Sequence, residues 1–123
     1  MVVDDDREIV EMTRLILESG GYRVVPASSG EEALKLIPSA RPDLVLLDIN
    51  MPGKDGWETL KLMKLDGETR HIPVAMFSIK FELRDKVQGL KEGAFDYITK
   101  PFSYDELLER VGRIFQQLSP GDH

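Results

Sequence analysis

The sequence predicts an α/β fold built on a doubly wound parallel sheet, and three observations lead to this prediction. Five short runs of apolar or β-branched residues alternate along the chain with five amphipathic stretches. Strands that alternate with helices form βαβ units, whose strands run parallel and whose crossovers are right-handed. The apolar runs are nearly continuous, as in Leu44–Leu47, which is typical of strands that are covered on both faces.

The elements follow from these runs and from the turn residues between them. We expect strands at Val2–Asp4, Arg23–Ala27, Asp43–Asp48, residues 72–78 and residues 96–99. We expect helices at Arg7–Ser19, from Ser29 to about Pro38, from Gly56 onward, around Leu83–Leu90, and from Ser103 to about Leu118.

Local signals support the helix positions. Ser29 followed by Glu32 is a capping box, and Asp6 is expected to be exposed or to cap the first helix. In that helix Ile9, Met12 and Ile16 are predicted to share the core face.

Composition limits the class of protein. The 123 residues, 41% hydrophobic and 31% charged, predict one domain over residues 1–118 with an exposed tail or linker stub at 119–123. No run is long enough to cross a membrane, and no cysteine is present, so a soluble cytoplasmic protein is expected. The net charge of −6 argues against nucleic acid or an anionic membrane as a partner of this domain.

Charged residues follow three of the expected strands. Asp4 and Asp5 come after the first strand, Asp48 ends the third, and Lys100 follows the fifth, while Ser78 ends the fourth. Carboxyl ends of parallel strands meet at one edge, where ligands of this architecture bind. Three converging carboxylates need a cation, and oxygen ligands alone favour a hard ion such as Mg²⁺. Together these groups predict a phosphoryl site in which one carboxylate is the nucleophile.

The motifs that carry these residues resemble the receiver domains of two-component response regulators, in the manner of chemotaxis receivers. They appear in the family's order and spacing as VVDDD, PDLVLLDINMPGKDGWE, IPVAMFS and GAFDYITKPF. The resemblance covers essentially the whole chain and implies a flavodoxin-like sheet of five strands in the order 2-1-3-4-5.

The resemblance also implies residue roles. Asp48 matches the phosphoacceptor, with Asp5 as a direct Mg²⁺ ligand and Asp4 acting largely through a bound water. The backbone carbonyl of Asn50 would be a further metal ligand. Ser78 matches the switch hydroxyl, Lys100 the phosphate-binding lysine, Tyr97 the aromatic that reports the switch, and Pro101 would follow a cis peptide bond.

The implied function is a phosphorylation switch. The donor would be a phosphohistidine on a sensor histidine kinase or a histidine phosphotransfer domain, or a small phosphodonor. Such a domain catalyses its own phosphorylation and slow dephosphorylation but turns over no external substrate. Its signal would pass through the surface of the fourth helix, fifth strand and fifth helix to a downstream protein, a fused output domain or a second copy of the chain.

Several alternatives compete with this interpretation. An EF-hand loop starting at Asp48 fails at its fifth and twelfth positions, Pro52 and Thr59. A dehalogenase-type phosphatase would need an acid where Asn50 stands, and a nucleotide-binding flavodoxin relative would need a phosphate loop where DDDRE stands. A pseudo-receiver that serves only as an interaction module remains the main alternative, although the acceptor, the acid pair and the lysine are all present.

Two positions depart from the family pattern, and two glycines fit it. Only Met1–Val3 precede the acid pair, which indicates either a trimmed N-terminus or a weakened sheet. Ile79 is bulky for the position after the switch hydroxyl. Gly53 and Gly56 are expected to supply turn dihedrals.

Overall fold

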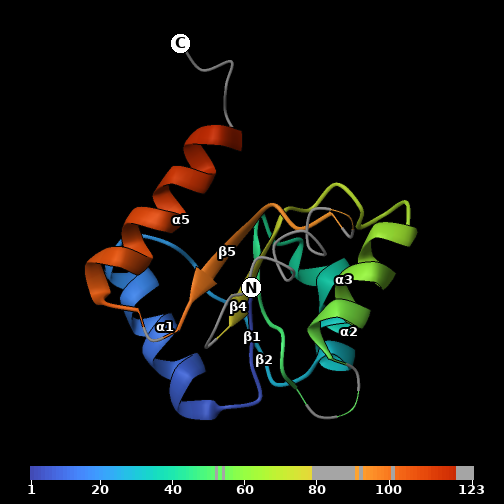
Figure 1. Ribbon diagram of the computed structural model, residues 1–123, viewed down its shortest axis with the longest axis horizontal. Helices are drawn as coiled ribbons and strands as arrows, with labels where there is room; N and C mark the ends of the chain where they lie inside the picture. The colour runs from blue at the N-terminus through green and yellow to red at the C-terminus, as the bar shows by residue number, and fades with distance from the viewer. Residues whose placement is uncertain (52, 54, 79–90, 92, 101, 119–123) are drawn as a thin grey trace.

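The computed structural model describes residues 1–123 except 52, 54, 79–90, 92, 101 and 119–123 (Figure 1). Its strands are β1 (Val2–Val3), β2 (Pro26–Ala27), β3 (Val45–Asp48), β4 (Val74–Ser78) and β5 (Asp96–Thr99). Its helices are α1 (Arg7–Ser19), α2 (Gly30–Ala40), α3 (Gly56–Leu65) and α5 (Tyr104–Leu118). The helix expected around Leu83–Leu90, Ile79 and the expected tail at 119–123 lie outside the described residues.

The five strands form one parallel sheet in the order β2-β1-β3-β4-β5. This confirms the doubly wound topology and the strand order that the resemblance implied. Helices α1 and α5 cover one face of the sheet, and α2 and α3 cover the other (Figure 1). In the described part of the chain the longest helix has 15 residues, and none is suited to spanning a bilayer.

Alternate residues of the strands feed two separate cores. Val3, Val45 and Leu47 join the cluster beneath α2 and α3, whereas Val2 and Leu46 join the cluster beneath α1 and α5. Because both faces are covered, every residue of β3 is buried. This double coverage explains why the strands lack the polar alternation of a one-sided sheet.

The helices begin where side-chain oxygens cap them. Asp6 accepts hydrogen bonds from the backbone N–H groups of Glu8 and Ile9, and Ser29 accepts one from Glu32. Before α5, Ser103 and Glu106 cap each other reciprocally, side chain to backbone N–H, at 3.1 and 3.3 Å. Asp6 is exposed, so both parts of its prediction are confirmed.

The short first strand is nevertheless flanked on both sides. Val2 N–H donates to Val25 O at 3.0 Å, and Asp4 N–H donates to Ala27 O at 3.1 Å. On the other side Leu46 N–H donates to the carbonyl of Met1 at 2.8 Å. Val2 and Val3 are almost fully buried, which fixes β1 at the centre of the sheet.

The predicted core face of α1 is wrong at one position. Met12 is 42% exposed, whereas Thr13, Ile16 and Leu17 are buried. These buried positions, three and four residues apart, centre the apolar face on the side of Thr13, so Met12 lies at its edge.

The prediction that the second helix ends near Pro38 is confirmed, although Pro38 itself lies inside the helix. Helix α2 continues to Ala40, and Arg41 ends it with a left-handed φ of 46°. Proline removes one backbone donor near the end of the helix. The neighbouring Ile37, 2% exposed, packs into the core beneath α2, and this packing holds the last turn in place.

We therefore predict that Pro38→Ala stabilises the protein. Restoring the missing backbone donor in the last turn of α2 raises the unfolding free energy by roughly 1–2 kcal/mol, after allowance for the greater freedom of the unfolded chain. Chemical denaturation measures the change, and Lys35→Ala, an exposed substitution in the same helix, is the matched control. An unchanged or lowered stability would contradict the interpretation that Pro38 is tolerated at a cost.

Candidate functional site

Two buried carboxylates lie side by side at the carboxyl edge of the sheet. Asp48 is the last residue of β3, and Asp4 follows β1. The register Val2↔Leu46 and Val3↔Leu47 places Asp4 beside Asp48 when it is continued by one residue. Their exposed fractions are 1% for Asp4 and 6% for Asp48, so both acids are buried at this edge.

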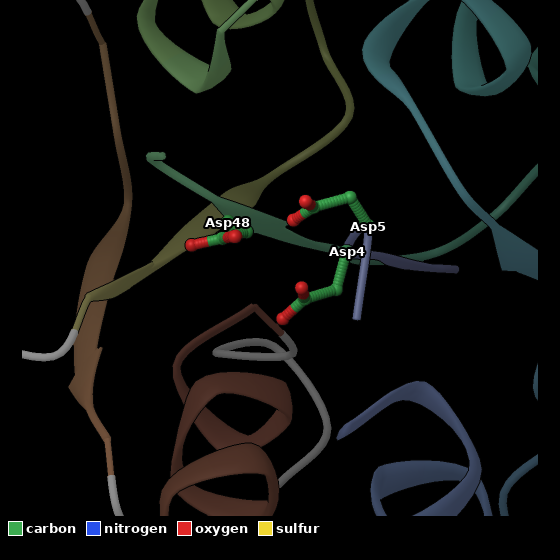
Figure 2. Close-up of side chains that lie close together, drawn as sticks. All are labelled: Asp4, Asp5 and Asp48. Carbon is green, nitrogen blue, oxygen red and sulfur yellow. The ribbon is translucent and has the colours of Figure 1, made fainter. Parts of the chain in front are cut away.

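A third carboxylate completes the cluster. One oxygen each of Asp4, Asp5 and Asp48 can be chosen so that all lie within 4.8 Å of one another. Figure 2 shows the three side chains converging from β1 and β3, and Asp5 is the exposed member. The convergence expected from the sequence is thus present. Three negative charges this close repel strongly, so the arrangement favours a bound cation.

Lys100, which follows β5, provides positive charge beside Asp4 and Asp48. Its Nζ lies 2.5 Å from Asp4 Oδ2 and 3.5 Å from Asp48 Oδ1, and its side chain is 11% exposed. The residue follows β5, so the contact joins the last strand of the chain to the first. One ammonium neutralises only part of the charge of three carboxylates.

The electrostatics of Asp48 reflect this incomplete compensation. Burial raises the pKa of its carboxyl to about 6, and repulsion from Asp4 adds to the effect. Lys100 and the backbone N–H of Asn50, which donates to Asp48 Oδ1 at 3.3 Å, act in the opposite direction. At neutral pH Asp48 is therefore mostly ionised and lacks full charge compensation.

The other residues expected at the site lie on β4, β5 and the loops. Ser78 ends β4 opposite Thr99, although its side chain is outside the described part of the structure, as is Pro101. Asn50 is exposed just beyond Asp48. The roles given to Ser78, Pro101 and the Asn50 carbonyl stay predictions.

Tyr97 lies on the other face of β5 from Lys100. It pairs with Met76, is half-buried and packs against the core beneath α2 and α3. Its carbonyl accepts a hydrogen bond from Arg110 Nη2 at 2.5 Å, and the same nitrogen lies 2.7 Å from Asp96 Oδ1. Arg110 thereby joins α5 to β5, the strand that contains Tyr97 and precedes Lys100.

Gly56 has a different role from the one expected. Its N–H donates to Ile49 O at 3.0 Å, and a Cβ at this position would lie 2.3 Å from Asp48 O. Glycine is therefore required because α3 begins against the backbone of Asp48. The left-handed turn dihedral belongs to Gly53, whose φ is 76°.

Comparison with known proteins identifies the family. The family model described as the response regulator receiver domain matches residues 1–112. The chain belongs to this family. Its fold is that of a receiver domain of the two-component systems.

Relatives and solved structures agree with this assignment. The receiver domain is 42% identical over 120 residues to the phosphate regulon transcriptional regulatory protein PhoB of Klebsiella pneumoniae, covering 98% of this chain and 52% of the relative. It superposes on the chemotaxis protein CheY4 of Vibrio cholerae with a TM-score of 0.88 at 32% identity, covering 92% and 94% of the two chains. A receiver domain of a Francisella response regulator gives a TM-score of 0.86 at 36% identity, covering 96% of each chain. The chain thus spans about half the length of the curated relatives.

We predict that Gly56→Ala disturbs the site. The added methyl group meets backbone atoms, which yield less easily than side chains, so a loss of roughly 1–3 kcal/mol in unfolding free energy is expected. Gly67→Ala is the matched control because its Cβ position is open and its φ is not left-handed. Thermal or chemical denaturation of both variants measures the difference, and equal stabilities would show that the close approach is not limiting.

A second prediction concerns the stability of the metal-free protein as a function of pH. The pKa of Asp48 is raised from 3.8 to about 6 on folding. The folded state therefore binds this proton more tightly than the unfolded chain, and the stabilising contribution is lost as the pH rises from about 4 to about 6. Asp48→Asn removes this loss of stability and should be more stable than the wild type by about 3 kcal/mol at pH 7.

Chemical denaturation in EDTA at pH 7 and at pH 4 measures this effect. The advantage of Asp48→Asn should shrink to a small fraction of this value at pH 4, where Asp48 is protonated in the folded state and only partly ionised in the unfolded chain. An advantage that is independent of pH would show that charge burial is not its cause.

Proposed function

We propose that this receiver domain is a phosphoacceptor switch in which Asp48 accepts a phosphoryl group with the help of Mg²⁺. The observation that carries the proposal is the cluster itself. Asp4, Asp5 and Lys100 surround the one carboxylate that ends a buried strand at the carboxyl edge. The acids would hold a cation, and that cation together with the Lys100 ammonium would attract a phosphoryl group to Asp48.

The donor set fits a hard divalent cation. All three side chains offer carboxylate oxygens, which Mg²⁺ prefers. Asp5 is exposed and would bind the ion directly, while Asp4 is engaged by Lys100 and would act largely through a bound water. The Asn50 carbonyl would be a further ligand. When bound, the ion would offset the repulsion between the carboxylates and the incoming phosphoryl oxygens.

The chemical step belongs to Asp48. Its ionised carboxylate oxygen forms a bond to phosphorus while the bond from phosphorus to the donor atom breaks, and that electron pair leaves with the donor. Lys100 would bind an oxygen of the phosphoryl group, because its Nζ lies 3.5 Å from Asp48 Oδ1. Water would later attack phosphorus, the bond from phosphorus to the Asp48 oxygen would break, and inorganic phosphate would leave the free carboxylate behind.

The switch would follow from the added charge. Phosphorylation adds nearly two negative charges at Asp48. The hydroxyl of Ser78 would bond a phosphoryl oxygen, and Tyr97 would rotate into the vacated space, which biases a two-state equilibrium. The surface formed by the fourth helix, β5 and α5 would carry the change.

Two kinds of partner follow from this proposal, a phosphodonor and a protein that receives the signal. The donor would be a sensor histidine kinase, a histidine phosphotransfer domain or a small phosphodonor. The PhoB relative is about twice as long as this chain, and its name describes a transcriptional regulator. An output domain of that kind, a separate downstream protein or a second copy of the chain would receive the signal.

Intact mass spectrometry after incubation with acetyl phosphate tests the proposal. A single phosphoryl adduct is expected with Mg²⁺ but not with EDTA, and the adduct should be labile to hydroxylamine. Asp48→Asn should form none, while Asp43→Asn, an exposed acid at the opposite end of the same strand region, should behave as the wild type. No adduct on the wild type, or the same adduct on Asp48→Asn, would favour a pseudo-receiver.

Mg²⁺ affinity gives a separate prediction. Asp5→Asn removes a proposed direct ligand and should weaken Mg²⁺ binding at least tenfold, the loss expected for a ligand of this kind. Asp6→Asn is the matched control, since it makes the same change one residue away and asparagine caps a helix as well as aspartate. Calorimetric titration measures both variants. An equal loss of Mg²⁺ affinity in Asp5→Asn and Asp6→Asn would show that the net charge, and not a defined ligand at Asp5, sets the affinity.

A further inference from the structure

We propose that Phe77 is a positioning residue for Lys100, its ring holding the ammonium between β5 and the carboxylates of Asp4 and Asp48. The role of Lys100 in this inference rests on the proposed function. Phe77 carries no charge and no polar side-chain atom, so the sequence alone gives it no role beyond the core.

The sheet register places Phe77 between the lysine and the acids. Asp48 pairs with Phe77, and Phe77 pairs with Ile98. Paired residues of neighbouring strands present their side chains on the same face, and Lys100, two residues after Ile98, continues along that face. To reach Asp48 and Asp4 from β5, the lysine must pass over β4 at Phe77.

The observed contact agrees with this path. Lys100 Nζ lies over the Phe77 ring, 5.9 Å from its centroid, and contacts Asp4 and Asp48 from there. The face of an aromatic ring attracts an ammonium, more strongly when water is excluded. Lys100 is only 11% exposed, so little water competes with the ring.

The ring is itself held rigidly. Phe77 is fully buried, and Phe102 packs against it with ring centroids 5.5 Å apart. Its carbonyl accepts a hydrogen bond from Ile49 N–H at 3.0 Å, which binds this part of β4 to the residue after Asp48. A fixed ring therefore limits the positions open to a side chain with four rotatable bonds.

The position of the ammonium has a consequence for metal binding. Lys100 and a divalent cation would share the carboxylate of Asp4, so each weakens the binding of the other. Lys100→Met should therefore tighten Mg²⁺ binding, and Phe77→Leu should tighten it partly, because leucine keeps the site apolar but removes the ring that holds the ammonium.

A double-mutant cycle on Mg²⁺ affinity tests the inference. We expect Phe77→Leu to tighten binding roughly threefold to tenfold in the wild-type background. In the Lys100→Met background it should change nothing, because the residue through which it acts is gone. Met76→Leu is the matched control, since Met76 is fully buried in the same strand but faces the other core. Equal effects of Phe77→Leu in both backgrounds, or an equal effect of Met76→Leu, would overturn the inference.

A metal-free measurement separates this inference from the proposed function. The acylation rate of Lys100 by an amine-reactive reagent in EDTA, read by peptide mass spectrometry, should rise roughly threefold or more in Phe77→Leu and stay unchanged in Met76→Leu. A wild type that binds no Mg²⁺ would overturn the proposed metal site, whereas this rate would still decide the role of Phe77. An unchanged rate would overturn the positioning role alone, even in a protein that binds Mg²⁺ and accepts a phosphoryl group.

Discussion

The repulsion between carboxylates at one edge of the sheet is the constraint on which the rest of the structure depends. Asp4 and Asp48 are buried beside each other, and Asp5 adds a third charge within 4.8 Å. A folded protein tolerates such a cluster only where positive charge lies nearby. Lys100, which follows β5 at the same edge of the sheet, meets part of this demand, and a cation would meet the remainder. The fold holds this excess of negative charge at the carboxyl edge of the sheet.

The surrounding scaffold makes the cluster rigid in three ways. Two apolar cores hold the strands from both faces, so their carboxyl ends cannot separate. The absence of a side chain at Gly56 lets α3 begin against the backbone of Asp48. Arg110 joins α5 to β5 through Asp96 and the carbonyl of Tyr97. Of these features, the close approach at Gly56 lies directly beside Asp48.

Much of this could be predicted from the sequence, for identifiable reasons. The alternation of apolar runs and amphipathic stretches gave the sheet and its layers, and Asp48 at the end of a buried run indicated the functional edge. Met12 was wrongly predicted to be buried because the apolar face of α1 is centred on Thr13. Helix α2 ends near Pro38 as predicted, and the packing of Ile37 carries it on to Ala40. The roles of Gly56 and Phe77 depend on which backbone or strand lies next to them. That information is in the register between strands and is not visible in a linear pattern.

The contact between Lys100 and Asp4 joins residues 96 positions apart in the chain. A chain that has formed β1 and β3 but has not yet added β5 would already hold the acids together without their lysine. Such an intermediate carries an uncompensated charge, so it is disfavoured relative to the complete sheet and depends more strongly on counter-ions from solution. The compensation of the acidic edge therefore depends on the last strand of the chain, and without that strand the acids would rely on counter-ions from solution.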